Sequence, residues 1–123
     1  MTTAVMVISP QNSLRTSVEQ LIEQGHYLVC PGVDNLGGFR HALNATETTP
    51  NVIIVDYWLS RSQTIDFIRG LKNQGFAVIL MGTSFLGKDV ATQEKVEFIE
   101  KPFTQNELLK AITRVNKGTT TKP

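Results

Sequence analysis

Asp56 and Lys101 are the charged residues that end predicted strands in this chain, and together they could carry phosphoryl-group chemistry. Asp56 follows four consecutive β-branched residues, so its carboxylate is expected at the tip of a buried strand, where an unpaired charge is costly. Lys101 can supply the partner from a neighbouring strand end. Two interpretations follow: a purely structural ion pair, or a carboxylate that accepts a phosphoryl group while the ammonium holds one of its oxygens.

The strands that position these residues are short apolar runs. They are predicted at 4–8, 27–30, 52–55, 77–81 and 96–99. A continuously apolar run is typical of a strand that is covered on both faces, and its alternation with helical periods indicates βα units around a parallel sheet. In such open sheets, ligands bind beyond the carboxyl ends of the strands.

The first and last predicted helices have readable ends. Asn12 or Ser13 is expected to cap the first helix, and Gly25 is expected to stop it. Thr104 and Glu107 form a capping box that opens the last helix.

The three helices between them are less sharply defined. One is predicted from Asn35, and another around 65–71 with its end near Gly75. Apolar residues are sparse over 83–95, so any helix there should be short.

Length and composition fit one small globular domain. The 123 residues, 41% hydrophobic and 19% charged, suffice for one core, which we assign to residues 1–117, with 118–123 as a polar tail or the start of a linker. The net charge of +1 gives no electrostatic reason to expect a nucleic acid or an anionic membrane as partner. No run approaches the roughly 18 apolar residues of a membrane span. No secretory signal is visible, and the lone Cys30 suits a reducing compartment, so we expect a cytoplasmic location.

Two segments resemble the response-regulator receiver family, and the likeness runs from residue 4 to about residue 116. Residues 98–103 match the family's aromatic-x-x-Lys-Pro-Phe signature, and residues 52–59 match the segment that carries its phosphoacceptor. The resemblance implies a doubly wound α/β, (βα)₅ flavodoxin-like receiver fold with a five-stranded parallel sheet in the order 2-1-3-4-5. It further implies that Asp56 is the phosphoacceptor and that Lys101 contacts the phosphoryl group. By the same resemblance, Pro102 lies on a cis bond and Phe98 is the aromatic switch.

The chain departs from the family at the metal site. Family members carry two adjacent acidic residues after the first strand, which hold Mg²⁺, and here these positions are Ser9 and Pro10. Mg²⁺ requires near-octahedral oxygen ligands, and only Asp56 and the backbone carbonyl of Trp58 remain in view. We therefore expect no firmly bound cofactor, only weak Mg²⁺ binding, and slow self-catalysed phosphorylation.

The fourth strand end departs as well. The family's hydroxyl residue aligns with Gly82, while Thr83 stands one place later and is the remaining candidate for a second phosphate contact. The segment that follows is about three residues shorter than the resemblance leads us to expect, which predicts a remodelled signalling surface.

These features predict a non-enzymatic, atypical receiver domain of two-component signal transduction. It would act mainly through contacts with a downstream regulatory protein or a second copy of itself, with little Mg²⁺-dependent phosphorylation. The alternative is a working phosphoacceptor whose Asp56 is phosphorylated by a partner histidine kinase. A third class, a small flavodoxin-like enzyme or nucleotide binder that uses the same strand ends, also stays open.

Overall fold

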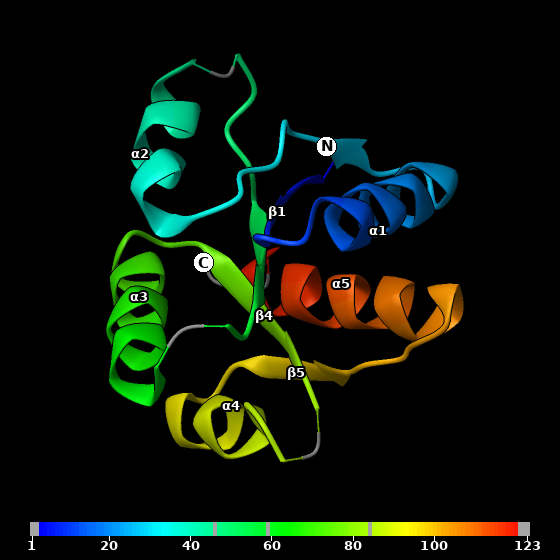
Figure 1. Cartoon of the computed structure of the whole chain (residues 1–123). Helices are drawn as coiled ribbons and strands as arrows, with labels where there is room; N and C mark the ends of the chain where they lie inside the picture. The colour runs from blue at the N-terminus through cyan, green and yellow to red at the C-terminus, as the bar shows by residue number, and fades with distance from the viewer. Residues whose placement is uncertain (1–2, 46, 59, 84, 121–123) are drawn as a thin grey trace.

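The computed structural model describes residues 3–45, 47–58, 60–83 and 85–120. Strands and helices alternate along these residues (Figure 1). The strands are β1 (Ala4–Ile8), β2 (Leu28–Val29), β3 (Val52–Asp56), β4 (Ala77–Gly82) and β5 (Glu97–Glu100). The helices are α1 (Asn12–Gln24), α2 (Leu36–Ala45), α3 (Arg61–Asn73), α4 (Lys88–Glu94) and α5 (Gln105–Thr120).

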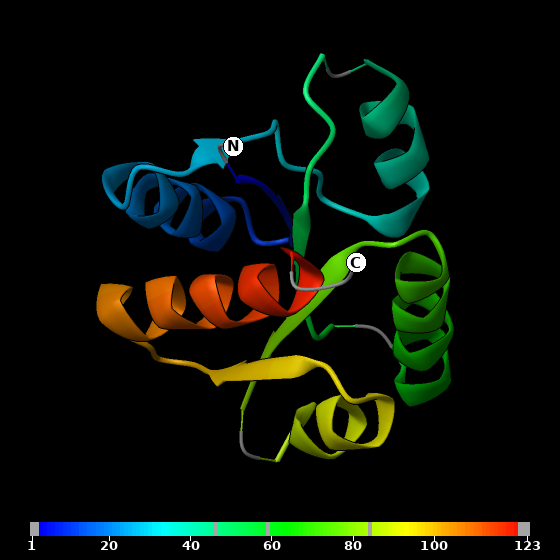
Figure 2. The same ribbon diagram turned by 180° about the vertical axis from the view of Figure 1, so that it is seen from behind.

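The strands form one parallel sheet in the order β2-β1-β3-β4-β5. Helices α1 and α5 cover one face, whereas α2, α3 and α4 lie on the other, as the two opposite views show (Figures 1 and 2). This arrangement confirms the predicted fold class. It also places the carboxyl ends of all five strands along one edge of the sheet, because parallel strands end on the same side.

Alternate residues of each central strand belong to two separate hydrophobic cores, one on each face of the sheet. In β3, Ile53 and Val55 join the cluster beneath α2, α3 and α4, while Val52 and Ile54 join the cluster beneath α1 and α5. All four side chains are buried. The two-residue period of a strand therefore explains why these runs are apolar throughout rather than alternating with polar residues.

The predicted helix starts agree with the structure at α5 and differ at α1, whereas the predicted stop of α1 at Gly25 is confirmed. The backbone N–H of Thr104 donates to Glu107 Oε1 at 2.8 Å, and that of Glu107 donates to Thr104 Oγ1 at 3.1 Å, which confirms the predicted capping box. The prediction that Asn12 or Ser13 caps α1 is wrong. The N-cap is Gln11, which makes no side-chain capping bond, and its backbone N–H donates to Ser9 Oγ in the preceding turn.

Other element boundaries shift by a few residues. Strand β2 is confined to Leu28–Val29, shorter than the predicted 27–30. Helix α5 continues to Thr120, so the boundary expected after residue 117 falls inside the helix, since a single glycine weakens a helix without ending it. The rest of the expected tail, residues 121–123, lies outside the described residues. As predicted, the helix between β4 and β5 is short.

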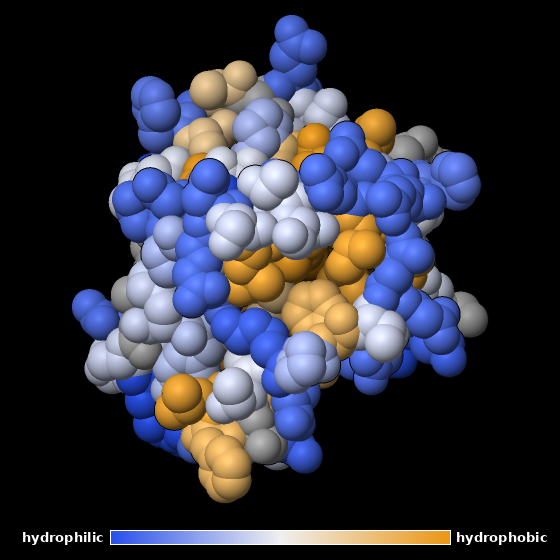
Figure 3. All heavy atoms as spheres, turned by 45° about the vertical axis from the view of Figure 1, so that its right-hand side comes forward, coloured by the Kyte–Doolittle hydropathy of each residue, from blue (hydrophilic) through white to orange (hydrophobic). Residues whose placement is uncertain are grey.

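Few large apolar side chains are exposed. Among the described residues these are Leu28, Phe85 and Leu86. Figure 3 shows a mostly polar face with apolar side chains gathered in a central hollow and a smaller apolar patch at its lower edge. None of the described helices is both long and apolar enough to cross a membrane.

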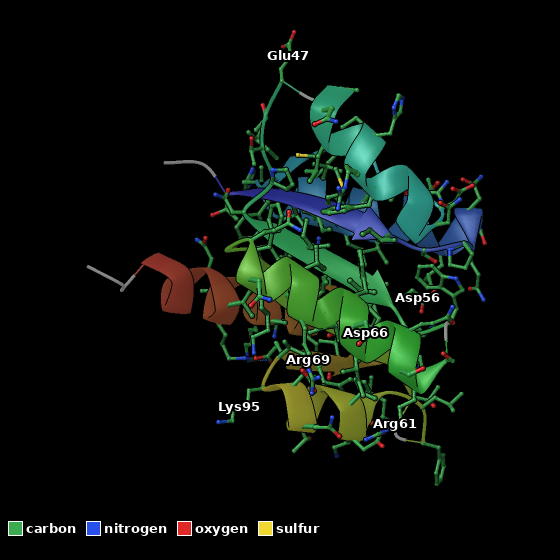
Figure 4. The ribbon with its side chains drawn as sticks, turned by 90° about the vertical axis from the view of Figure 1, so that its left-hand side faces the viewer. Glu47, Asp56, Arg61, Asp66, Arg69 and Lys95 are labelled. Atoms are coloured by element: carbon green, nitrogen blue, oxygen red, sulfur yellow. The ribbon has the colours of Figure 1, made fainter. Side chains whose placement is uncertain are left out.

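Helix α4 is fastened to α3 by two ion pairs. Arg61 pairs with Asp89, and Arg69 donates to both carboxylate oxygens of Glu94 at 2.8 and 3.0 Å. Figure 4 shows the two arginines at the junction of these helices. The hydrogen bond from Arg69 holds the pKa of the Glu94 carboxyl below its ordinary value. Since α4 has only two turns, it depends on such contacts rather than on its own helical stability.

Candidate functional site

The sheet register brings the ends of β1, β3 and β5 together. Ile8 pairs with Val55, so Ser9 and Asp56 are the next residues along two neighbouring strands. Lys101 follows the last residue of β5, and its backbone N–H donates to Gly82 O at 2.7 Å. Figure 4 shows Asp56 at the arrowhead end of its strand, at the edge of the sheet.

Asp56 is engaged at both carboxylate oxygens. Lys101 Nζ donates to Oδ1 at 2.7 Å, and Ser9 Oγ donates to Oδ2 at 2.8 Å. Asp56 is 3% exposed and Ser9 is fully buried, whereas the Lys101 side chain is 26% exposed. The carboxylate is thus paired and hydrogen-bonded, which offsets the penalty of burying its charge.

Ser9 is itself held firmly in place. Its hydroxyl oxygen accepts a hydrogen bond from the Gln11 N–H at 3.1 Å, and its carbonyl accepts one from Arg15 Nη1 at 2.6 Å. Its own N–H donates to Val33 O at 3.0 Å. Because the hydroxyl accepts from Gln11, its proton is directed toward Asp56, and the hydrogen bond to the carboxylate has a defined direction.

The donors around Asp56 do not fit a magnesium ion. Mg²⁺ takes six oxygen ligands in near-ideal octahedral geometry, usually with one or two carboxylates free to bind it. Both Asp56 oxygens already accept hydrogen bonds, and the neighbouring side chains contribute a hydroxyl and an ammonium. Among residues 3–45, 47–58, 60–83 and 85–120, no three His, Cys, Asp or Glu side chains gather where they could hold a metal.

Thr83 faces the β4–α4 turn. Its Oγ1 accepts a hydrogen bond from the Leu86 N–H at 3.1 Å, and the backbones of the two residues exchange hydrogen bonds of 3.0 and 3.1 Å. At Gly82, a Cβ would collide with the carbonyl oxygen of Leu86. A hydroxyl residue at position 82 is therefore incompatible with this turn.

The aromatic residues beside Asp56 pack inward. Tyr57, Trp58 and Phe98 are partly buried against the core cluster beneath α2, α3 and α4. The Phe98 ring edge lies 3.2 Å from the position of a Cβ at Gly82 and 3.3 Å from that of a Cβ at Gly87. Gly87 has a φ of 112°, so it allows a backbone conformation that other residues rarely adopt. Two glycines thus make room for the ring.

Sequence reasoning found the two charged residues of this site and missed one of its hydrogen bonds. Asp56 and Lys101 lie together as expected, and the Lys101–Pro102 peptide bond is cis. The sequence singled out Ser9 only because it stands where the receiver family has an acidic residue. The structure shows that its hydroxyl donates a hydrogen bond to Asp56. Serine and aspartate at the ends of adjacent strands were the available signal.

Comparisons with known proteins agree with this fold. No family model and no curated protein matches the chain. Solved structures do match. A receiver domain protein from Clostridium thermocellum has a TM-score of 0.77 at 22% identity, over 98% of this chain and 99% of its own. A LuxR-family DNA-binding response regulator from Staphylococcus aureus has 0.73 at 25%, over 93% and 98%. The beryllofluoride-activated NtrC4 receiver domain dimer has 0.74 at 22%, over 94% and 98%.

The chain has the receiver fold. These matches cover nearly all of both chains, so the likeness concerns the whole domain. In the receiver fold of this chain, the carboxyl edge of the sheet carries Ser9, Asp56 and Lys101 as one hydrogen-bonded cluster.

Proposed function

We propose that this chain is a receiver-type regulatory module of two-component signalling that works through protein contacts. Its Asp56 is not phosphorylated efficiently in the presence of Mg²⁺. The observation that carries the proposal is the double engagement of Asp56, by Ser9 at 2.8 Å and by Lys101 at 2.7 Å. The receiver fold supports a role in signalling. The two hydrogen bonds to the Asp56 carboxylate support the loss of Mg²⁺-dependent phosphorylation.

The electrostatics of phosphoryl transfer supports the second part. A transferring phosphoryl group develops charge that a metal ion normally neutralises, so a site without one keeps a high barrier. At this site the fixed positive charge in contact with Asp56 is Lys101. One ammonium can hold one phosphoryl oxygen, and it leaves the remaining charge to solvent.

Phosphorylation of Asp56 by a partner histidine kinase is the second candidate. The Lys101 ammonium favours it, because a cation on a carboxylate oxygen would also stabilise an acyl phosphate on the same residue. The Ser9 hydroxyl would have to leave Oδ2 before that oxygen could attack. In this case the histidine kinase would hold the phosphoryl group in line with Asp56, an arrangement that the receiver does not provide by itself.

The two candidates separate in a chemical phosphorylation assay. The full chain is incubated with acetyl phosphate and Mg²⁺, and the acyl phosphate is followed by intact-protein mass spectrometry. We expect no adduct above that of Asp56→Asn, which cannot form one. Stoichiometric phosphorylation of the wild-type chain that Asp56→Asn abolishes would overturn the proposal. If an adduct forms only with a histidine kinase, the second candidate holds.

A further inference from the structure

A pocket opens between α2 and α3, on the face of the sheet opposite to α1 and α5 (Figures 1 and 4). It has a volume of about 250 Å³, and both helices contribute to its lining. We call it the α2–α3 pocket. Its lining residues do not include Ser9, Asp56 or Lys101, so it is a site separate from the hydrogen-bonded cluster at the sheet edge.

Aromatic rings form much of the apolar part of the pocket. Phe39 and Leu71 are buried, whereas Leu43 and Phe67 are half-buried and still reach the opening. The rings of Phe39 and Phe67 meet edge to face, with centroids 5.6 Å apart and planes at 88°. Aromatic rings attract one another in this arrangement beyond the effect of burial alone. A further ring in the pocket can pack against these two in the same way.

Gly70 leaves space on the α3 side of the pocket. It lies inside the helix with an ordinary backbone, without the positive φ that would require a glycine. Nothing lies within 4 Å of the position that a Cβ would take, so close packing does not require a glycine either. Glycine weakens a helix interior relative to alanine. What the missing side chain provides is open volume in the pocket wall, and a bound molecule would use it.

Two opposite charges stand at the rim of the pocket. Arg40 comes from α2 and Asp66 from α3, and both side chains are exposed. Within residues 3–45, 47–58, 60–83 and 85–120, neither side chain takes part in a hydrogen bond or an ion pair. The rim therefore offers one cation and one anion to a ligand that has an aromatic part buried below them.

We propose that the α2–α3 pocket binds a small aromatic zwitterion, the class to which the free aromatic amino acids belong. The ring enters between Phe39, Leu43 and Phe67, Arg40 donates to the carboxylate, and Asp66 accepts from the ammonium. Each chemical part of the lining thus has a partner in the ligand. The volume agrees with one ring and a short polar group, because it equals that of roughly eight waters at about 30 Å³ each.

The size of the ligand sets the expected affinity. A molecule of about twelve non-hydrogen atoms, bound through one ring and two exposed ion pairs, should have a Kd of roughly 0.1–1 mM. Because the ligand contacts both α2 and α3, it stabilises the folded chain when it binds. This inference goes beyond the proposed function and does not depend on it, since it involves no contact with Asp56.

An NMR titration of the full, ¹⁵N-labelled chain with phenylalanine tests the proposal. We expect saturable shifts of backbone amides in α2 and α3. Phenylpropanoate lacks the ammonium and phenylethylamine lacks the carboxylate, so each should bind roughly three- to fivefold more weakly, the factor that an exposed ion pair contributes. The neutral amide N-acetylphenylalaninamide represents an aromatic residue inside a peptide, and it should bind more weakly still.

Paired variants assign the two charges. Arg40→Gln should weaken phenylalanine and phenylpropanoate and leave phenylethylamine unchanged, whereas Asp66→Asn should weaken phenylalanine and phenylethylamine and leave phenylpropanoate unchanged. Gly70→Leu directs its side chain into the open volume and should weaken all three ligands by roughly tenfold or more. Lys88→Gln is the matched control, because Lys88 is exposed on α4 and lies outside the pocket lining.

Three results would overturn the inference. They are no saturable shift at phenylalanine concentrations well above the expected Kd, saturable shifts that lie outside α2 and α3, and a folded Gly70→Leu chain that binds as tightly as the wild type. Equal binding of phenylalanine and N-acetylphenylalaninamide would overturn the assignment of a zwitterion. Circular dichroism checks that each variant is folded. If Gly70→Leu does not fold, the ligand series and the two charge variants still decide the outcome.

Discussion

The Ser9 hydroxyl donates a 2.8 Å hydrogen bond to Asp56 Oδ2, from the end of β1 to the end of β3. Both side chains are buried, so the bond is shielded from water. It occupies the carboxylate oxygen that Lys101 leaves free. A hydroxyl and an ammonium of the chain itself therefore contact both oxygens of the Asp56 carboxylate.

Removal of the Lys101 ammonium should destabilise the fold. Lys101→Met leaves the Asp56 carboxylate buried with one neutral donor, and we expect a loss of about 1–3 kcal/mol, reduced from the value for a fully buried pair because Lys101 is partly exposed. Urea unfolding followed by circular dichroism measures it. Lys101→Met with Asp56→Asn should lose less than the sum of the two single variants, since the uncompensated charge is then gone. Strict additivity would contradict a coupled pair.

The Ser9 hydroxyl should contribute measurably to stability. Ser9→Ala leaves Asp56 Oδ2 and the Gln11 N–H without this partner, which we expect to cost about 1–2 kcal/mol. Ser13→Ala, an exposed position on α1, is the matched control and should change little. Equal unfolding free energies for the two variants would show that the Ser9 bond is of no consequence.

Restoration of an acidic pair should create a metal response. In Ser9→Asp with Pro10→Asp, two carboxylates join Asp56 at the sheet edge, and three like charges then repel one another, with Lys101 as the cation in contact with Asp56. We expect a lower melting temperature than the wild type in chelator, and a rise with millimolar Mg²⁺ that the wild type lacks. Thermal unfolding with and without EDTA measures both. A variant that Mg²⁺ does not stabilise would mean that the cluster geometry cannot hold the ion even with carboxylates present.

Gly82 should not accept the hydroxyl residue that the receiver family carries there. Gly82→Thr directs its Cβ at the Leu86 carbonyl and crowds Phe98, so we expect a loss of about 1–3 kcal/mol and a looser β4–α4 turn. Gly70→Ala is the control. Position 70 lies inside α3 with nothing near an added Cβ, and alanine should stabilise the helix by up to about 1 kcal/mol. Differential scanning calorimetry should give melting shifts of opposite sign.

The Arg69–Glu94 pair should make stability sensitive to acid. Its hydrogen bond lowers the pKa of Glu94 in the folded state below the ordinary 4.5. The contribution is therefore fully present above that value and is lost as the pH falls through the folded-state pKa. Urea unfolding from pH 6 to about pH 3 should show Glu94→Gln less stable than the wild type at the upper end, with the gap closing in acid. A gap that stays constant with pH would exclude this linkage.

The fold could be predicted because its signals are local and redundant. Residues 52–55 are all β-branched and apolar, and burial on both faces of a central parallel strand requires that composition. The capping box of Thr104 and Glu107 fixed the start of α5. The predicted cap of α1 was wrong: the N-cap is Gln11, whose backbone N–H donates to Ser9 Oγ, and that contact depends on where β1 ends.

The site could be predicted only in part, for a related reason. The charges of Asp56 and Lys101 identify them as partners from type and position alone. The role of Ser9 depends on register between β1 and β3, which follows from the assembled sheet. The room for Phe98 between Gly82 and Gly87 depends on the positive φ of Gly87. The spacing of apolar residues in the sequence does not indicate that conformation.

The most direct test is a titration of the wild-type chain with Mg²⁺ in the presence of beryllofluoride, followed by the fluorescence of Trp58. Trp58 is partly buried two residues after Asp56, so its emission should report a metal or phosphoryl analogue bound there. We expect no saturable change up to roughly 10 mM, since one carboxylate that already accepts two hydrogen bonds offers Mg²⁺ few of the six oxygen ligands it requires. Saturation at sub-millimolar Mg²⁺ that disappears in Asp56→Asn would contradict this expectation.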